Sequence, residues 1–378
     1  MSEHEAVESG PARFLFTTCQ VGAESALKRE VSRKLPALRF AYSRPGFLTF
    51  KLPAEHDVDD DARQCVFARA WGQTLGQAAG DSVDARAAQA WQLAGEPAYQ
   101  ALHVWQRDVA RPGHRGFVPH ITPAAIQAEM AIRRHGPEDD STGRTALARN
   151  AKPGDRVLDC VIVEPDQWWI GWHRASDAES CIPGGLRQVE MPPHAVSRAY
   201  AKMVEALAWS ALPIAPNDRT VELGCAPGGA SQALLDHGLQ VLGIDPAKVD
   251  PRVLENERFT HVQKRAADVR RRDFRNVRWL AADMNVDPGT ALDAVEAIVT
   301  HPSVSIRGML ITLKLLDWKL ADAMDDYVRR VREWGYANVR VRQLAHNGQE
   351  VCLSAQRAAK KRSRKRSPIK RRRGKRRD

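Results

Sequence analysis

Residues 221–230 read VELGCAPGGA, and this segment decides the fold of the chain. The residues just before the first glycine, 219–223, are β-branched and apolar enough to predict a short buried strand. The residues after the last glycine, 231–235, have the composition and spacing of a helix. Between them lie three glycines, Gly224, Gly228 and Gly229. Because glycine has no Cβ, the backbone can turn sharply there and can approach a ligand closely. The segment therefore predicts a strand, a tight loop and a helix whose N-terminus faces a bound molecule.

The acidic residue after the next strand indicates what that molecule contains. Residues 240–244 predict a second strand, and it ends at Asp245, whose carboxylate can accept hydrogen bonds from ribose hydroxyls. A dinucleotide normally requires G-x-G-x-x-G, whereas this loop reads GCAPGG and includes Pro227, which has no N–H group. S-adenosylmethionine has no phosphate to bind and fits the loop better. The alternative, an ordinary turn between core elements, is disfavoured by the flanking strand, the helix and Asp245.

Composition limits the class of protein. The 378 residues are 43% hydrophobic and 27% charged, which suffices for a sizeable core and two or three domains. The sequence has no apolar run of the length that a membrane span needs, and its acidic, polar beginning is unlike a signal peptide. We therefore expect no membrane partner and a cytoplasmic location. The six cysteines form no C-x-x-C pair, so we expect neither structural zinc nor disulfides.

The basic character of the chain is confined to its C-terminal segment. Residues 358–378 carry 13 Lys or Arg and one Asp, a net charge of +12, whereas the whole chain has +11. Such a segment has few apolar residues to bury and is predicted to be a disordered tail. Its charge favours salt-sensitive binding to the phosphate backbone of RNA. A solvated extension that only aids solubility is the alternative.

Three units precede the tail. Residues 13–60 and 61–180 each mix strands and helices, and 194–357 alternate them as a parallel sheet does, with an Asn-Gly hairpin at the end. In the second unit, three tryptophans lie close together on one predicted strand, Trp168, Trp169 and Trp172. They could stack unpaired bases or pack on a half-buried strand.

Charged residues lie near the predicted strand ends of the third unit. Asp283 closes one buried strand, Lys314 lies late in another, and Glu350 opens the last one. Lys202 lies on a helix before the glycine loop. Taken singly, these residues also fit ordinary roles as turn, cap or exposed positions, although a lysine in so apolar a strand favours function. Because ligands bind at the carboxyl ends of an open parallel sheet, the four together indicate a reactive site.

These residues resemble a known family. Lys202, Asp283, Lys314 and Glu350 around a G-x-x-P-G-G loop look like the Lys-Asp-Lys-Glu tetrad of FtsJ-type RNA ribose 2′-O-methyltransferases. The longer chain is similar to the family that methylates a cytidine ribose of large-subunit (23S) ribosomal RNA, in FLFTTCQVGAE, RFAYSRPGFLTFK, SRAYAKMVEA and VELGCAPGGAS. The resemblance implies an α/β fold. A Rossmann-like methyltransferase domain over 194–357 would follow a ferredoxin-like subdomain over 13–60 and a THUMP-like RNA-binding domain over 61–180.

The resemblance also implies the site residues. The cofactor S-adenosylmethionine would contact Ser197, Gly224, Cys225, Ala226, Pro227, Gly228, Asp245, Asp268 and Asp283. Lys314 would remove the proton of the ribose 2′-hydroxyl, Asp283 would orient it and the methyl donor, and Lys202 and Glu350 would position the ribose. A free lysine, with a pKa of about 10.4, is charged at neutral pH. We expect burial and the Lys202 charge to lower the pKa of Lys314. No metal is implied, because no phosphoryl charge needs neutralising.

Three other interpretations remain open. The same chemistry could act on another RNA, such as transfer RNA. The chain could bind RNA and the cofactor without transferring a methyl group, although the complete tetrad disfavours this. A dinucleotide-dependent oxidoreductase is the third, and the poor phosphate-binding loop disfavours it.

Overall fold

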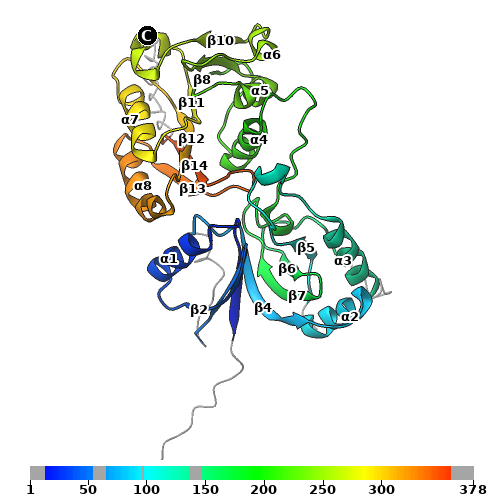
Figure 1. The fold of residues 1–378 in the computed structure, drawn as a ribbon. Coiled ribbons are helices and arrows are strands. Elements are labelled where there is room, and N and C mark those ends of the chain that lie inside the picture. Colours follow the sequence, from blue (N-terminus) through cyan, green and yellow to red (C-terminus); the bar gives the residue numbers. More distant parts are fainter. Residues whose placement is uncertain (1–12, 54–64, 96–97, 137–146, 359–378) are drawn as a thin grey trace, which may run out of the picture.

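The computed structural model describes residues 13–53, 65–95, 98–136 and 147–358. These residues form two seven-stranded sheets, each with its own helices (Figure 1). The basic tail predicted over 358–378 lies outside the described residues, except for Ala358. Among the helices of the described ranges, none is long and apolar enough to cross a bilayer.

The first sheet has the strand order β2-β3-β1-β4-β7-β6-β5. Its strands are β1 (Phe14–Thr18), β2 (Arg39–Arg44), β3 (Phe47–Lys51), β4 (Ala70–Ala78), β5 (Ala101–Gln106), β6 (Arg156–Glu164) and β7 (Gln167–Arg174). Its helices are α1 (Glu24–Lys34), α2 (Val83–Ala94) and α3 (Pro123–Arg134). No sequence pattern predicts β4, which pairs with β1 on one side and β7 on the other. One sheet therefore runs through both predicted N-terminal units, 13–60 and 61–180.

The tryptophans of this sheet pack in its interior. Trp168 and Trp169 are 2% and 9% exposed, so their ring faces are not available to nucleobases. Trp172 is half-buried, and the Arg156 guanidinium lies 4.0 Å from its ring centroid. The base-stacking interpretation is therefore wrong for Trp168 and Trp169, and packing accounts for them.

The second sheet has the order β10-β9-β8-β11-β12-β14-β13. Its strands are β8 (Arg219–Leu223), β9 (Gln240–Ile244), β10 (Phe259–Val262), β11 (Trp279–Ala282), β12 (Gly308–Lys314), β13 (Asn338–Arg342) and β14 (Glu350–Gln356). Its helices are α4 (Ala199–Ser210), α5 (Gly229–Asp236), α6 (Pro251–Leu254), α7 (Pro288–Val299) and α8 (Met324–Glu333). Five strands are parallel, and β14 and β13 close the sheet antiparallel, as predicted.

Helices cover both faces of the second sheet (Figure 1). Leu280 and Ala282 of β11 lie in one buried cluster, together with residues of α7 and α8, whereas Ala281 lies in the other, with residues of α4 and α5. A strand buried on both faces needs apolar residues at successive positions, which explains the continuous apolar runs of the sequence. The chain winds outward from β8 in one direction and from β11 in the other, so β8 and β11 border the switch point where such sheets bind ligands.

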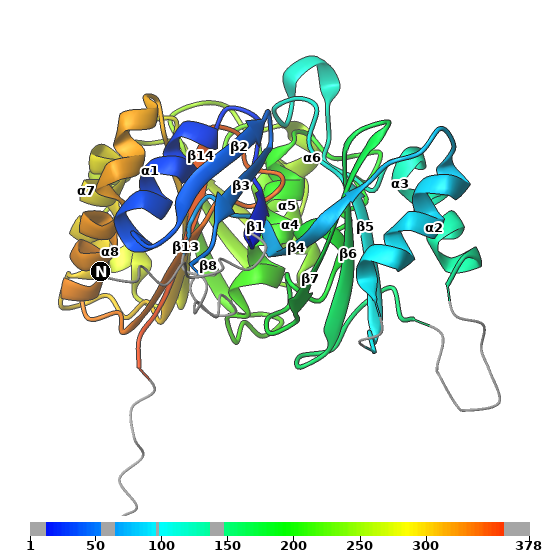
Figure 2. The same ribbon diagram turned by 90° about the horizontal axis from the view of Figure 1, so that it is seen from below.

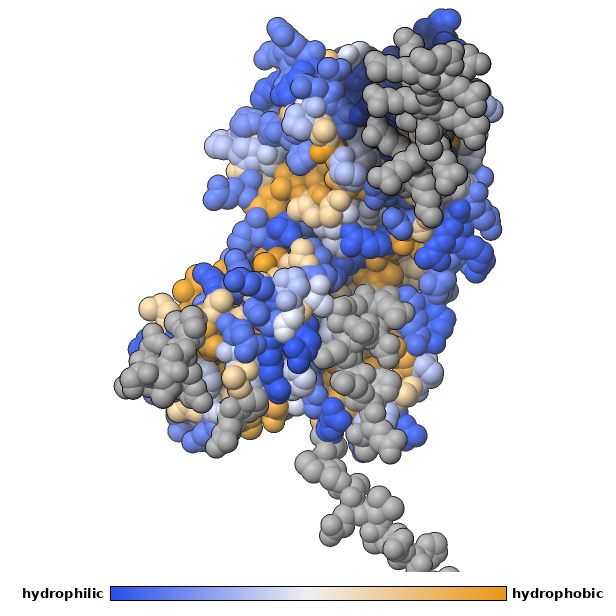
Figure 3. Space-filling model, turned by 180° about the vertical axis from the view of Figure 1, so that it is seen from behind, coloured by the Kyte–Doolittle hydropathy of each residue, from blue (hydrophilic) through white to orange (hydrophobic). Residues whose placement is uncertain are grey.

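The two sheets meet at the segment between β13 and β14. There the Gln343 N–H donates to the Val66 carbonyl at 2.8 Å, and the Gln20 side chain donates to the Leu344 carbonyl at 3.0 Å. Beside it, Arg29 of α1 pairs with Asp322, in the 3₁₀ turn before α8, at 2.9 Å. Figure 2 shows α1 lying beside this part of the second sheet. Figure 3 shows a largely hydrophilic surface on which hydrophobic side chains gather near the narrow middle of the molecule.

A buried ion pair supports this junction. The Arg69 guanidinium donates to both carboxylate oxygens of Asp108, at 2.7 and 2.9 Å, and both side chains are 3% exposed. The Arg69 carbonyl in turn accepts a hydrogen bond of 2.6 Å from Arg342 of β13. The pair therefore links the first sheet to the hairpin of the second.

We predict that Arg69→Ala lowers the free energy of unfolding by about 3–5 kcal/mol, because it leaves the Asp108 carboxylate buried without a partner. Urea denaturation followed by circular dichroism measures the change. Arg134→Ala, which removes an exposed ion pair with Asp84, is the matched control and should have little effect. Equal, small losses in both variants would contradict the importance of the buried pair.

Candidate active site

The glycine loop passes close to the end of the neighbouring strand. Gly224 and Gly228 have φ values of +79° and +122°, in the region that favours glycine. A Cβ at Gly224 would lie 2.8 Å from the Asp283 carbonyl oxygen. The loop backbone therefore lies directly against Asp283, and both the conformation and the lack of space require glycine at position 224.

Asp245 holds the loop in place. One of its carboxylate oxygens accepts a hydrogen bond of 3.1 Å from the Ala226 N–H, and the other accepts one of 2.7 Å from the Ala247 N–H. Asp245 is half-buried, and a carboxylate has lone pairs for further donors, so it remains able to bind ribose hydroxyls.

The other predicted cofactor residues differ in how they face the site. The Cys225 side chain is 2% exposed and lies in the core, so this residue could contact a cofactor only through its backbone. Pro227 is exposed, and Ser197 is half-buried and packs against Gly229 at the start of α5. Asp268 is exposed in a 3₁₀ turn after β10, and no interaction recorded in the described ranges joins it to the loop.

The four charged residues meet in one closed cluster. The Lys202 ammonium lies 2.6 Å from Asp283 Oδ2 and 3.1 Å from Glu350 Oε1. The Lys314 ammonium lies 2.7 Å from Asp283 Oδ1 and 2.5 Å from Glu350 Oε2. Each lysine thus bridges both carboxylates. Lys314 and Glu350 face each other in the β12–β14 ladder, so the antiparallel register brings them together.

Contact among these four side chains determines their protonation states. Burial alone would raise the pKa values of Asp283 and Glu350, but the lysines lower both. Burial alone would lower the pKa of Lys314, but Asp283 and Glu350 together raise it above its ordinary value of 10.5. The expectation that burial and Lys202 lower the pKa of Lys314 is therefore wrong in this state, because two carboxylates contact its ammonium group.

A buried acid behind the loop was not predicted from the sequence. Glu222 of β8 is 1% exposed, and its carboxyl group hydrogen-bonds the Ser231 hydroxyl of α5. Burial raises the pKa of Glu222 to about 8, so it is mostly protonated at neutral pH. It links the strand before the glycine loop to the helix after it. Its only signal in the sequence is an acid inside an apolar strand.

The comparisons with known proteins agree with this geometry. Residues 195–377 match the family model described as FtsJ-like methyltransferase. The described part of this match, residues 195–358, contains the second sheet and is an FtsJ-like methyltransferase domain. Such a domain implies S-adenosylmethionine as the cofactor, and the Cβ-free cradle at Gly224 and the acceptor Asp245 fit a nucleoside without phosphate groups.

The chain is also similar to curated proteins named ribosomal RNA large subunit methyltransferase M. The relative from Thauera aminoaromatica is 27% identical over 55% of this chain and 58% of its own length. The relative from Laribacter hongkongensis is 27% identical over 65% and 67%. The relative from Tolumonas auensis is 23% identical over 90% and 94%. The match thus spans less than two thirds of the Thauera protein and nearly all of the Tolumonas protein.

We predict that Gly224→Ala weakens binding of S-adenosylmethionine by at least about tenfold, since strain of about 1–3 kcal/mol would push the loop away from Asp283. Isothermal titration calorimetry measures the affinity. Gly335→Ala is the matched control, because Gly335 also has a positive φ, +91°, but open space around it. Equal affinities in the two variants would show that the close approach does not shape the site.

Proposed function

We propose that the chain transfers the methyl group of S-adenosylmethionine to a ribose 2′-hydroxyl of large-subunit ribosomal RNA, with a cytidine of the 23S RNA as the acceptor. The closed cluster of Lys202, Asp283, Lys314 and Glu350 beside the glycine loop carries this proposal. The similarity to proteins named ribosomal RNA large subunit methyltransferase M supports the choice of RNA. A 2′-hydroxyl acceptor restricts the substrate to RNA.

The acceptor hydroxyl must lose its proton as it reacts, and we propose Lys314 as the base. When bound, the cofactor supplies an electrophilic methyl group on a positively charged sulfur. Lys314 is protonated in the free protein because it contacts two carboxylates. The cluster of two ammonium and two carboxylate groups has no net charge, so a further positive charge beside it disfavours one ammonium and lowers the pKa of Lys314. The base would then form only in the cofactor-bound state.

The other three residues would position Lys314 and the ribose. Asp283 contacts both lysines and adjoins the loop at Gly224, so it can align the base with the methyl donor. Lys202 holds both carboxylates in place from α4. Glu350 is fixed at the start of β14, and its carboxylate also accepts a hydrogen bond of 3.2 Å from the Gly348 N–H. These groups are proposed to hold the 2′-hydroxyl near the Lys314 amine.

We also propose that the first sheet contributes RNA-binding surface, in the manner of the ferredoxin-like and THUMP-like units. The Gln20 side chain hydrogen-bonds the Asn347 carbonyl, and the Asn347 amide lies 3.5 Å from Glu350. RNA held by the first sheet would therefore lie next to the cluster. The tail over 358–378, of which only Ala358 is described, is proposed to bind phosphate groups. A ribosomal RNA substrate supports a cytoplasmic location.

Lys314→Ala should reduce methyl transfer by about 10²–10⁴-fold while cofactor binding is retained, because it removes the base but leaves the loop intact. The assay follows labelled methyl groups into large-subunit ribosomal RNA and locates them by nucleoside mass spectrometry. Lys319→Ala, an exposed lysine of the next turn, is the control. Normal transfer by Lys314→Ala would refute the role of Lys314. Methylation of transfer RNA alone would identify another substrate, and cofactor binding without any transfer would identify a non-catalytic protein.

The charge argument gives a separate prediction for the pKa of Lys314. In the free protein it should exceed 10.5, and S-adenosylmethionine should lower it. S-adenosylhomocysteine, which lacks both the transferred methyl group and the sulfonium charge, should leave the pKa of Lys314 raised. Nuclear magnetic resonance of ¹³C-labelled lysine, assigned with Lys314→Arg, measures the titration. Equal pKa values with the two ligands would contradict activation by the cofactor's charge.

A further inference from the structure

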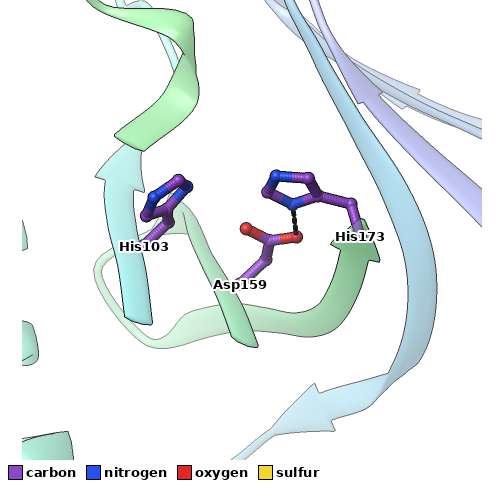
Figure 4. A group of neighbouring side chains, drawn as sticks. All are labelled: His103, Asp159 and His173. Carbon is purple, nitrogen blue, oxygen red and sulfur yellow. Dashed lines mark hydrogen bonds and ion pairs between the residues drawn. The ribbon is translucent and has the colours of Figure 1, made fainter. Parts of the chain in front are cut away.

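Three side chains of the first sheet converge at a site remote from the glycine loop. His103 of β5, Asp159 of β6 and His173 of β7 point toward one another (Figure 4). They are 1%, 0% and 6% exposed. One potential metal-ligand atom from each lies within 4.8 Å of the other two. The sheet creates this cluster, because Asp159 faces His103 in the β5–β6 ladder and His173 lies on the next strand.

Two atoms of this cluster are buried without a hydrogen-bond partner. Among the described residues, neither His103 Nε2 nor Asp159 Oδ1 has one. An unsatisfied buried polar atom lowers the stability of the fold, so two of them in one cluster indicate a missing partner.

A backbone carbonyl orients the His173 ring. His173 Nε2 lies 2.8 Å from the Ser180 carbonyl oxygen. Metal-ligating histidines usually donate their second ring N–H to a backbone carbonyl or carboxylate in this way. The other contact of this ring is a hydrogen bond of 2.7 Å between His173 Nδ1 and Asp159 Oδ2. A metal ion at this contact would take the place of the shared proton.

We propose that His103 Nε2, the Asp159 carboxylate and His173 Nδ1 bind one divalent transition-metal ion, with Zn²⁺ as the best match. Two imidazoles and one carboxylate suit zinc, and a water molecule can complete a tetrahedral site. A purely hydrogen-bonded cluster would leave His103 Nε2 and Asp159 Oδ1 unsatisfied, whereas a metal ion satisfies both. The sequence shows no zinc motif because the ligands are far apart in the chain.

The site is structural and separate from the proposed methyl transfer. It connects β5, β6 and β7 to the segment that carries Ser180 and Cys181. His103 and His173 also line a small cavity that includes Arg69 and, from β13, Arg342. The ion would therefore stiffen the first sheet where it meets the FtsJ-like domain, and the inference does not depend on the proposed function.

The test uses the full chain freed of metal with a chelator. Calorimetric titration with Zn²⁺ should show one equivalent bound, and Co²⁺ should give the visible absorption of a nitrogen- and oxygen-ligated site. His103→Ala and Asp159→Asn should each weaken Zn²⁺ binding by more than about 100-fold, since loss of an outer partner alone costs 10–100-fold. His120→Ala, an exposed histidine, should bind as wild type.

Two readouts keep the proposal falsifiable if His103→Ala fails to fold. Asp159→Asn is nearly isosteric, and Zn²⁺ should raise the unfolding temperature of the wild-type chain but not that of Asp159→Asn. Failure of the wild-type chain to bind Zn²⁺ or Co²⁺ would overturn the proposal. Unchanged affinity in Asp159→Asn would also overturn it.

Discussion

Contact between two lysines and two carboxylates is the interaction on which the candidate active site depends. Each of the four groups is largely buried, and an isolated charge there would be costly. Together they neutralise one another, so four charges can lie at the edge of an apolar sheet. The cluster therefore allows charged groups to be buried. Because it is neutral as a whole, a further charge beside it would shift the pKa values of its members.

The fold brings this cluster to the glycine loop. Parallel pairing of β8 with β11 places Asp283 against Gly224 at the switch point of the sheet. Antiparallel pairing of β12 with β14 places Glu350 opposite Lys314. Lys202 approaches from α4. Lys202 and Glu350, which are more than 100 positions apart in the chain, thus meet because α4 packs on this sheet.

Local sequence patterns predicted the second sheet well. Apolar runs, the glycine loop and the Asn-Gly turn are short-range signals, and they indicated the parallel strands and the closing hairpin. The residues of the cluster were predicted to form a reactive site from their positions near strand ends and from the family resemblance. Strand β4 was not predicted, because a segment with two glycines and two glutamines has no clear alternation and is stabilised by pairing on both sides.

Properties that depend on distant partners could not be predicted. The pKa of Lys314 rises rather than falls, because its ammonium contacts Asp283 and Glu350, and no spacing in the sequence reveals those contacts. The cluster of His103, Asp159 and His173 likewise exists only through the pairing of β5, β6 and β7. The sequence also does not distinguish a tryptophan buried in a sheet from a tryptophan that stacks on bases. Only the packing of the sheet does.

Nucleoside mass spectrometry of large-subunit ribosomal RNA from cells tests the central claim most directly. RNA from cells that lack the gene is compared with RNA from the same cells carrying either the wild-type chain or Asp283→Asn. We predict that one 2′-O-methylated nucleoside disappears with the gene, returns with the wild-type chain and stays absent with Asp283→Asn. An unchanged set of 2′-O-methylated nucleosides after deletion, or full restoration by Asp283→Asn, would contradict the account.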